Sequence, residues 1–184
     1  IGTAGIARKA LIPAIERTDH TVDAIASRDE SRARAVADEF DIPRAFGSYE
    51  SLLGAPELDA VYNPLPNGLH AEWTKRAADE GLHVLPEKPL TVDADEAVSV
   101  VAYSRDAGVT LLEGFMYRYY PRTERAVELV EAELEGVPAV NASFKFRLAG
   151  RPDAVRLDPS LARGALLDVG WSAVSAARHF LRPP

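Results

Sequence analysis

The residue with the most distinctive chemical setting in this chain is Lys88, which lies between Glu87 and Pro89. A proline disfavours the helical region for the residue before it, so Lys88 belongs to a loop. The apolar run 82–85 is typical of a short buried strand, and ligands of open α/β sheets bind past the carboxyl ends of such strands. A partly dehydrated lysine at that edge can exchange a proton with a substrate hydroxyl. The alternative is a solvated loop lysine.

A carboxylate further along the chain is the natural partner for that amine. Asp168 stands in an otherwise apolar stretch that opens the last predicted helix. Burying a carboxylate is costly unless it is paired. An ion pair with Lys88 would offset the cost and orient the amine. A salt bridge to a nearby arginine is the alternative.

The start of the chain fits a dinucleotide-binding loop of the form G-x-A-x-x-A. Gly2 would form the tight turn, Ala4 would let the backbone approach a pyrophosphate, and Ala7 would allow close packing of helix on strand. The helix N-terminus behind the loop offers free N–H groups and positive dipole to a phosphate. A strand–helix turn without a ligand is the alternative. The whole candidate loop is Gly2, Thr3, Ala4, Gly5, Ile6 and Ala7.

Two further segments favour a nicotinamide dinucleotide. Ser27 and Arg28 follow the second predicted strand where an acidic residue would bind the ribose 2′-hydroxyl. A hydroxyl and a guanidinium instead suit a 2′-phosphate, with Arg32 adding charge, so we expect NADP, with NAD possible. The alternative is a loop capped by Asp29.

The rigid turn that follows residues 60–63 would cross the nicotinamide half of the cofactor. Asn67 or His70 could instead cap the next helix. The candidate cofactor residues of this turn are Leu65, Pro66, Asn67 and His70.

Periodicity predicts an α/β fold in which strands alternate with helices through residue 119. Several predicted helices stop at a glycine, as a left-handed cap requires. Pro13 would kink or shorten the first helix. The predicted helices are residues 6–17, 29–40, 70–80, 93–107 and 121–135, with stops at Gly81, Gly108 and Gly136; the predicted strands are 21–26, 60–63, 83–85 and 110–112.

The pattern changes after Gly136. Residues 137–148 alternate strictly between apolar and polar side chains, which indicates a half-buried strand of an antiparallel sheet. A loop over 149–159 and a helix over 165–181 follow. We therefore expect a Rossmann-type domain over 1–120 and the beginning of an α+β antiparallel-sheet domain over 121–184.

Composition limits the classes of partner. The 184 residues are 47% hydrophobic and 27% charged, with a net charge of −7, which argues against nucleic acid. No cysteine is present, so disulfides and thiolate metal sites are excluded, and we expect no metal. We find no membrane-spanning run and no signal peptide, and expect a cytoplasmic protein. Both chain ends look cut rather than natural.

In combination, these motifs resemble the glucose–fructose oxidoreductase / inositol dehydrogenase family, especially its branch of NADP-dependent xylose dehydrogenases and dimeric dihydrodiol dehydrogenases. The resemblance covers essentially the whole chain. The motifs that carry it are the loop at 2–7, Ser27-Arg28, the turn at 64–67 with His70, Glu87-Lys88-Pro89, the segment 115–118, and Asp168-Val169-Gly170.

The resemblance implies a Rossmann domain, a larger open-sheet domain that often mediates oligomers, and hydride exchange between a nicotinamide and a sugar, polyol or cyclic alcohol. Lys88 matches the family's catalytic lysine and Asp168 its motif carboxylate, while Glu87 would contact the cofactor. Aromatic residues near Arg118 at a strand's carboxyl end could line a substrate pocket or form interdomain core. The candidate substrate residues are Arg118, Tyr119, Trp171 and Ser172.

The chain departs from the family at the presumed proton donor. Ser172 stands where the family has a tyrosine or histidine, and a serine hydroxyl is too weak an acid for that role near neutral pH. Tyr117, Tyr119 or a water could replace it. A non-catalytic nucleotide or sugar binder is therefore the second hypothesis. Family members are also nearly twice this length.

Overall fold

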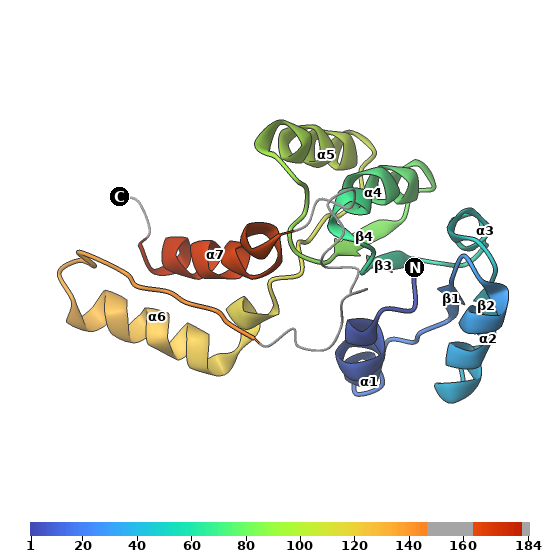
Figure 1. The fold of residues 1–184 in the computed structure, drawn as a ribbon, viewed down its shortest axis with the longest axis horizontal. Coiled ribbons are helices and arrows are strands. Elements are labelled where there is room, and N and C mark those ends of the chain that lie inside the picture. Colours follow the sequence, from blue (N-terminus) through green and yellow to red (C-terminus); the bar gives the residue numbers. More distant parts are fainter. Residues whose placement is uncertain (147–163, 182–184) are drawn as a thin grey trace.

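The computed structural model describes residues 1–146 and 164–181, and its first part is a parallel sheet between helices (Figure 1). Strand β1 (Ala24–Ala26) pairs in parallel with β2 (Arg44–Phe46), and β3 (Ala60–Asn63) pairs in parallel with β4 (His83–Pro86). These short strands are rich in apolar residues, as expected where helices cover both faces of a sheet.

Hydrogen bonds from residues at the N-terminus bridge the two two-stranded sheets. The Ile1 nitrogen donates to the Tyr62 carbonyl at 2.6 Å, and the Gly2 N–H donates to the Ala26 carbonyl at 2.8 Å. On the far side of β4, Leu111 forms a parallel bridge to Val84. The order across the sheet is therefore β2, β1, residues 1–2, β3, β4 and Leu111. This is the order of a doubly wound Rossmann sheet, so the predicted fold class is confirmed.

The helices begin at the caps that their sequences provide. Side chains of Asp29, Ser48 and Asp93 accept hydrogen bonds from first-turn N–H groups of α2, α3 and α5. Gly81 and Gly108 follow α4 and α5 with φ of +74° and +73°, as predicted. The bounds are η1 Ala7–Leu11, α1 Ile12–Ile15, α2 Glu30–Glu39, α3 Tyr49–Leu53, η2 Asn67–Leu69, α4 His70–Asp79, α5 Ala94–Asp106, η3 Met116–Tyr119, α6 Pro121–Glu133, η6 Leu166–Gly170 and α7 Trp171–Phe180.

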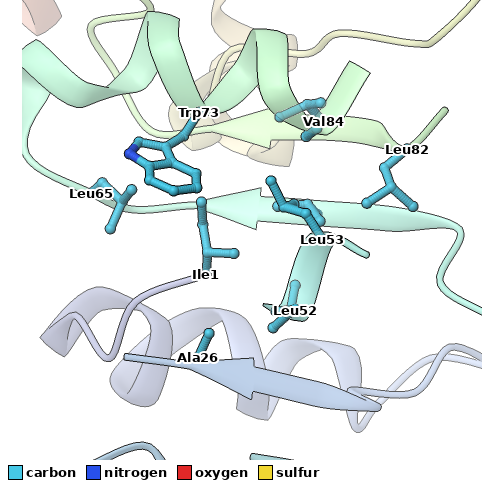
Figure 2. Packing of buried hydrophobic residues seen from close by; sticks show 10 residues of the cluster. Ile1, Ala26, Leu52, Leu53, Leu65, Trp73, Leu82 and Val84 are labelled. Atoms are coloured by element: carbon cyan, nitrogen blue, oxygen red, sulfur yellow. The ribbon is translucent and has the colours of Figure 1, made fainter. Parts of the chain in front are cut away.

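The main core lies between the sheet and helices α3 and α4 (Figure 2). Trp73 of α4 and Tyr49 of α3 pack edge to face, with ring centroids 5.0 Å apart. Ile1 is part of this core, since its side chain is buried between β1 and β3. The remaining buried members are Ala26, Leu52, Leu53, Val61, Leu65, Ala77, Leu82 and Val84.

Several sequence expectations about secondary structure differ from the structure. The first helix is shorter than 6–17, because η1 is a wide π turn and α1 ends at Ile15, close to Pro13, which has no N–H to donate. Strand β1 covers only Ala24–Ala26 of the predicted 21–26. Helix α6 ends at Glu133, and an extended Leu134 follows it, so no left-handed glycine cap at Gly136 ends this helix. Strand β2 and helix α3 were not predicted.

A further difference concerns the alternating segment, of which residues 137–146 are described. No strand is assigned there, and Phe144 and Phe146 are exposed. A strand needs a neighbouring strand for its ladder hydrogen bonds, and within 1–146 and 164–181 no strand is paired with this segment. Residues 147–148 and the predicted loop 149–159 lie outside the described residues. In the described ranges, no helix is long and apolar enough to cross a bilayer.

The position of Val84 allows a test of this sheet. Val84 is buried in the core, between β3 and the segment at Leu111. We expect Val84→Ala to lower the free energy of unfolding by about 1–3 kcal/mol, through lost burial and a cavity. Val98→Ala is the matched control, because Val98 on α5 is 70% exposed and its truncation should change stability by less than about 0.5 kcal/mol. Urea unfolding midpoints measure both, and equal shifts would contradict the assigned core.

Candidate functional site

The carboxyl ends of the parallel strands bring the predicted motifs to one edge of the sheet. The Gly2 loop follows the strand position between β1 and β3, and a Cβ on Gly2 would lie 2.9 Å from the Leu65 side chain. The Glu87 N–H donates to the Asn63 carbonyl at 2.9 Å, which fixes the end of β4 against the end of β3. The glycine loop, the turn after β3 and the Lys88 loop are therefore neighbours.

Lys88 and Asp168 are brought together at this edge. The Lys88 ammonium donates a hydrogen bond to the backbone carbonyl of Asp168, and its nitrogen lies 3.9 Å from the carboxylate oxygen Oδ1. The two side chains are 23% and 20% exposed, so both are largely withdrawn from water. The solvated alternative for Lys88 does not hold. Asp168 forms the expected ion pair with Lys88.

This arrangement can hold an amine in a fixed direction. The carbonyl accepts a hydrogen bond from the ammonium, while the carboxylate balances its charge at a longer distance. Asp168 belongs to the wide π turn η6, a local geometry that is frequent at functional sites. An oriented, partly desolvated amine beside a carboxylate is suited to binding a hydroxyl group and to exchanging a proton with it.

His70 fixes the turn after β3 to the loop that carries Lys88. Its ring is buried, with Nδ1 at 2.7 Å from the Pro89 carbonyl and Nε2 at 2.6 Å from the Leu65 carbonyl. Burial lowers the pKa of His70 below its ordinary value of 6.5, although the two carbonyls and the charges of Glu87 and Glu113 act in the opposite direction. We expected His70 to contact the cofactor. That contact stays a prediction; in this structure backbone carbonyls occupy both ring nitrogens, so the ring holds the two loops together.

Asn63 and Tyr62 complete the support for this edge, and neither was predicted as a site residue. Asn63 is fully buried, accepts the Leu65 N–H at 3.3 Å and donates to the His70 carbonyl at 3.2 Å. The Tyr62 hydroxyl donates to Glu87 at 2.8 Å, and burial, with the charge of Glu87 and this bond, raises the pKa of Tyr62. Asn63 could have been identified from the sequence, because it is a polar residue in an apolar strand directly before a proline.

The glycine loop has the geometry that the motif predicts. Gly2 has φ of +82°, a left-handed conformation that side-chain-bearing residues rarely adopt, and it closely approaches Leu65. No side chain caps the helix that follows, so its first N–H groups have no side-chain acceptor. Thr3, Ala4, Gly5 and Ile6 lie at this helix start, and Ala7 is buried beneath it. These features fit a phosphate group.

The segment after β1 presents a hydroxyl and two guanidinium groups. Ser27 is buried, and its Oγ accepts the Asp29 N–H at 3.3 Å. Arg28 and Arg32 are exposed, and in the ranges described neither forms an ion pair or side-chain hydrogen bond. Asp29 caps α2, as the alternative required, but the cap leaves both arginines accessible to a phosphate.

The turn between β3 and α4 is held by its own backbone as well. Leu65 is buried against Gly2, and the Leu69 N–H donates to the Pro66 carbonyl at 2.8 Å in η2. Asn67 begins η2, so it lies one turn before the main helix α4. Pro66 and Asn67 are half-buried, which leaves them partly accessible at the sheet edge.

The segment after Leu111 carries a carboxylate that sequence reasoning did not assign to the site. Glu113 Oε1 accepts the Leu90 N–H at 2.8 Å and the Trp171 indole N–H at 3.1 Å. Next to it, a Cβ on Gly114 would lie 3.0 Å from the Pro86 carbonyl, so only glycine fits there without movement. Trp171 remains 36% exposed.

The other candidate substrate residues differ in their surroundings. Arg118 donates to Ser175 of α7 at 3.1 Å and lies over the Phe115 ring, so it attaches η3 to α7. The Tyr117 hydroxyl lies 2.9 Å from the same Ser175 oxygen. Tyr119 is 60% exposed. Ser172 is half-buried in the first turn of α7. Phe115 is buried, while Met116 is exposed.

Comparison with known proteins gives consistent matches. A model of the oxidoreductase family with an NAD-binding Rossmann fold (glucose–fructose oxidoreductase, inositol dehydrogenase, MocA) matches residues 1–115. D-xylose 1-dehydrogenase (NADP(+)) 2 of Haloferax volcanii is 60% identical over 184 residues, which cover 100% of this chain and 57% of that protein. Trans-1,2-dihydrobenzene-1,2-diol dehydrogenase of Xenopus tropicalis is 34% identical over 164 residues, 89% of this chain and 48% of the relative.

Solved structures are similar over nearly the whole chain. A 3-ketoreductase from Actinomadura kijaniata in complex with NADP and TDP-benzene has a TM-score of 0.90 and 38% identity, over 97% of this chain and 55% of that one. An aldose-aldose oxidoreductase from Caulobacter crescentus complexed with glycerol has a TM-score of 0.88 and 28% identity, with the same coverage. The chain spans about half the length of the curated relatives it matches.

The setting of His70 predicts a pH dependence of stability. The unfolded histidine takes up a proton as the pH falls below its ordinary pKa of 6.5, whereas the folded ring resists protonation. The unfolded state then binds more protons, so the free energy of unfolding should fall as the pH is lowered through this range. Urea unfolding between pH 7.5 and pH 5 measures the slope.

The comparison of variants isolates the contribution of this histidine. His70→Gln should lose that part of the slope, whereas His20→Gln, at an exposed position, should keep it. Equal slopes in the wild type and in His70→Gln would show that the buried ring is not responsible.

Proposed function

This chain belongs to the oxidoreductase family with an NAD-binding Rossmann fold, and from that premise we propose that the protein is an NADP-dependent oxidoreductase acting on a sugar, polyol or cyclic alcohol. The observation that carries the proposal is Lys88 held against Asp168 at the carboxyl edge of the sheet, beside the glycine turn. The relatives act on related groups, since their names describe a sugar dehydrogenase and a diol dehydrogenase.

We assign the cofactor to the residues that surround this edge. The free N–H groups of the loop Thr3–Ile6 would bind the pyrophosphate, and Gly2 would allow the close approach of the backbone. Ser27, with the two arginines Arg28 and Arg32, would bind a 2′-phosphate. Leu65, Pro66 and Asn67 would face the nicotinamide half, together with Glu87. When bound, the nicotinamide supplies or accepts a hydride.

The residues of the chain would then manage the proton. Lys88 would donate a hydrogen bond to the substrate hydroxyl or carbonyl oxygen and exchange a proton with it. Asp168 would hold the amine through its carbonyl and balance its charge through its carboxylate. Trp171, Tyr119 and Arg118 would border the substrate. Ser172 would contact the substrate without acting as the acid, so Tyr117, Tyr119 or a water would have to relay the proton.

We further propose that residues 1–120 form the nucleotide-binding domain, and that residues 121–184 begin a second domain that completes the substrate site. In the described ranges, exposed apolar side chains of α6 and α7, such as Leu129 and Val174, are consistent with that second part. Assembly of the whole protein into a homo-oligomer is part of the same proposal.

The role of Lys88 is tested by Lys88→Met in the full-length protein. Losing the proton-exchanging amine should lower kcat by about 100- to 10,000-fold, while the Kd for NADPH changes little. Lys75→Met is the matched control, because Lys75 donates to Ser99 on the surface and lies outside the site. Steady-state turnover with a panel of aldoses, polyols and ketones, and NADPH fluorescence titration, measure the two quantities.

The outcomes of this experiment separate the two hypotheses. Wild-type turnover in Lys88→Met would contradict the assigned role of the amine. Saturable NADPH binding by the wild-type protein without consumption across the whole panel would instead support a non-catalytic binder that lost its proton donor at Ser172.

The preference for NADP is tested at Arg28. A charge-assisted hydrogen bond to a phosphate contributes about 1.5–3 kcal/mol, so Arg28→Ala should raise the Kd for NADPH about 10- to 100-fold. The Kd for NADH, which has no 2′-phosphate, should hardly change. Arg34→Ala is the control, because Arg34 on α2 pairs with Glu30 at the surface. Equal losses for both cofactors would contradict the 2′-phosphate assignment.

A further inference from the structure

We propose that Glu113 is a positioning residue for the pair formed by Lys88 and Asp168, and that a single carboxylate oxygen fixes both segments that carry them. The inference rests on the proposed function, because that function gives the pair its catalytic meaning. Glu113 itself is assigned no contact with substrate or cofactor.

The geometry of the carboxylate carries the argument. Glu113 Oε1 accepts the backbone N–H of Leu90 at 2.8 Å, two residues after Lys88. The same oxygen accepts the indole N–H of Trp171 at 3.1 Å, three residues after Asp168. One ionised acceptor therefore ties the lysine loop to the helical segment of the aspartate. Hydrogen bonds to a charged acceptor are among the stronger ones in proteins.

The backbone beneath Glu113 is itself held firmly. The Leu112 N–H donates to the Val84 carbonyl at 3.0 Å, and the Gly114 N–H donates to the Pro86 carbonyl at 2.8 Å. The glycine at 114 permits this approach, because a Cβ there would meet the Pro86 carbonyl at 3.0 Å. The residues before and after Glu113 are therefore both hydrogen-bonded to β4. A carboxylate on such a rigid base can define the position of what it binds.

The hydrogen bond from Trp171 to Glu113 attaches the helical segment at 164–180 close to Asp168. Among the described residues, Ser175 also attaches this segment, because it binds Tyr117 and Arg118 of η3. Ser175 lies two turns beyond Asp168, so it fixes the far part of the helix. Trp171 is only one turn from Asp168, and its bond to Glu113 therefore sets where the Asp168 carbonyl meets the Lys88 ammonium.

Three variants of the full-length protein separate positioning from a structural role. Glu113→Leu removes both hydrogen bonds, whereas Glu113→Gln retains an amide oxygen that can accept two donors. Trp171→Phe removes only the indole N–H. We expect Glu113→Leu to lower kcat by up to about 100-fold with little change in the Kd for NADPH. Glu113→Gln should lose far less activity, and Trp171→Phe should fall between them.

A double variant tests whether the two residues act together. If the carboxylate acts through the indole, Glu113→Leu combined with Trp171→Phe should be no more impaired than Glu113→Leu alone. Losses of kcat that simply multiply would overturn the proposal.

A second readout does not depend on turnover. The rate of acylation of each lysine by an amine reagent can be followed by peptide-resolved mass spectrometry. In the wild type, Lys88 should react more slowly than the exposed Lys9, because its ammonium is bound to Asp168. Glu113→Leu should accelerate the labelling of Lys88 several-fold, and Glu113→Gln should not. Asp168→Ala keeps the backbone carbonyl and removes only the carboxylate 3.9 Å away, so its rate shows how much of the protection of Lys88 comes from the ion pair.

The two readouts make failure of the inference distinguishable from failure of the proposed function. Absence of turnover in the wild type would count against the function, while the labelling rates would still test the positioning role. A wild-type labelling rate at Lys88 in Glu113→Leu would overturn the inference, as would equal acceleration in Glu113→Gln. Should Glu113→Leu not fold, Trp171→Phe decides, because an unchanged labelling rate and kcat in that variant would also overturn it.

Discussion

The candidate site depends on one contact between distant parts of the chain, in which the ammonium of Lys88 meets the backbone carbonyl of Asp168 across 80 positions of sequence. A hydrogen bond to a neutral carbonyl fixes the direction of the amine without neutralising its charge. The carboxylate 3.9 Å away compensates that charge. Because both side chains keep a fifth or so of their surface exposed, neither bears the full desolvation cost of a buried ion pair.

The parallel sheet makes this contact possible, because all its strands end at the same edge. The buried side chain of His70 connects the turn after β3 to the lysine loop, and the buried side chain of Asn63 holds that turn to the start of α4; both side chains bind backbone groups. Tyr62 and Glu113 add two further attachments at the same edge. The catalytic candidates are few, and most of the polar residues around them bind backbone. Such supporting bonds are what keep a reactive group within the narrow geometry that chemistry needs.

The positions of Lys88 and of the glycine loop could be predicted from sequence, because each lies where a strand ends and a turn begins. Lys88 before a proline and Gly2 before a helix both have local signals that the structure follows. Strand β2 could not be predicted, because Arg44-Ala45-Phe46 is too short to show a period, and its pairing with β1 is a tertiary choice. Helix α3 has five residues, although Ser48 as its cap was a usable signal.

The opposite error is a predicted strand that the structure does not assign, and it arose in a segment with no strand paired to it in the described ranges. Residues 137–146 alternate as a strand should, yet no neighbouring strand within the described ranges supplies the ladder, so periodicity alone could not decide. Glu113 was not predicted as a site residue for a related reason. Its role comes from Leu90 and Trp171, which lie 23 and 58 positions away in the sequence, and no local pattern reports such a convergence.

The most direct test of the account is a crystal structure of the full-length protein with NADP and a substrate alcohol or ketone bound. We predict that the Lys88 nitrogen lies within about 2.6–3.2 Å of the substrate oxygen, beside the nicotinamide ring, and still bonded to Asp168. A Lys88 side chain pointing into solvent, with another group on that oxygen, would contradict it.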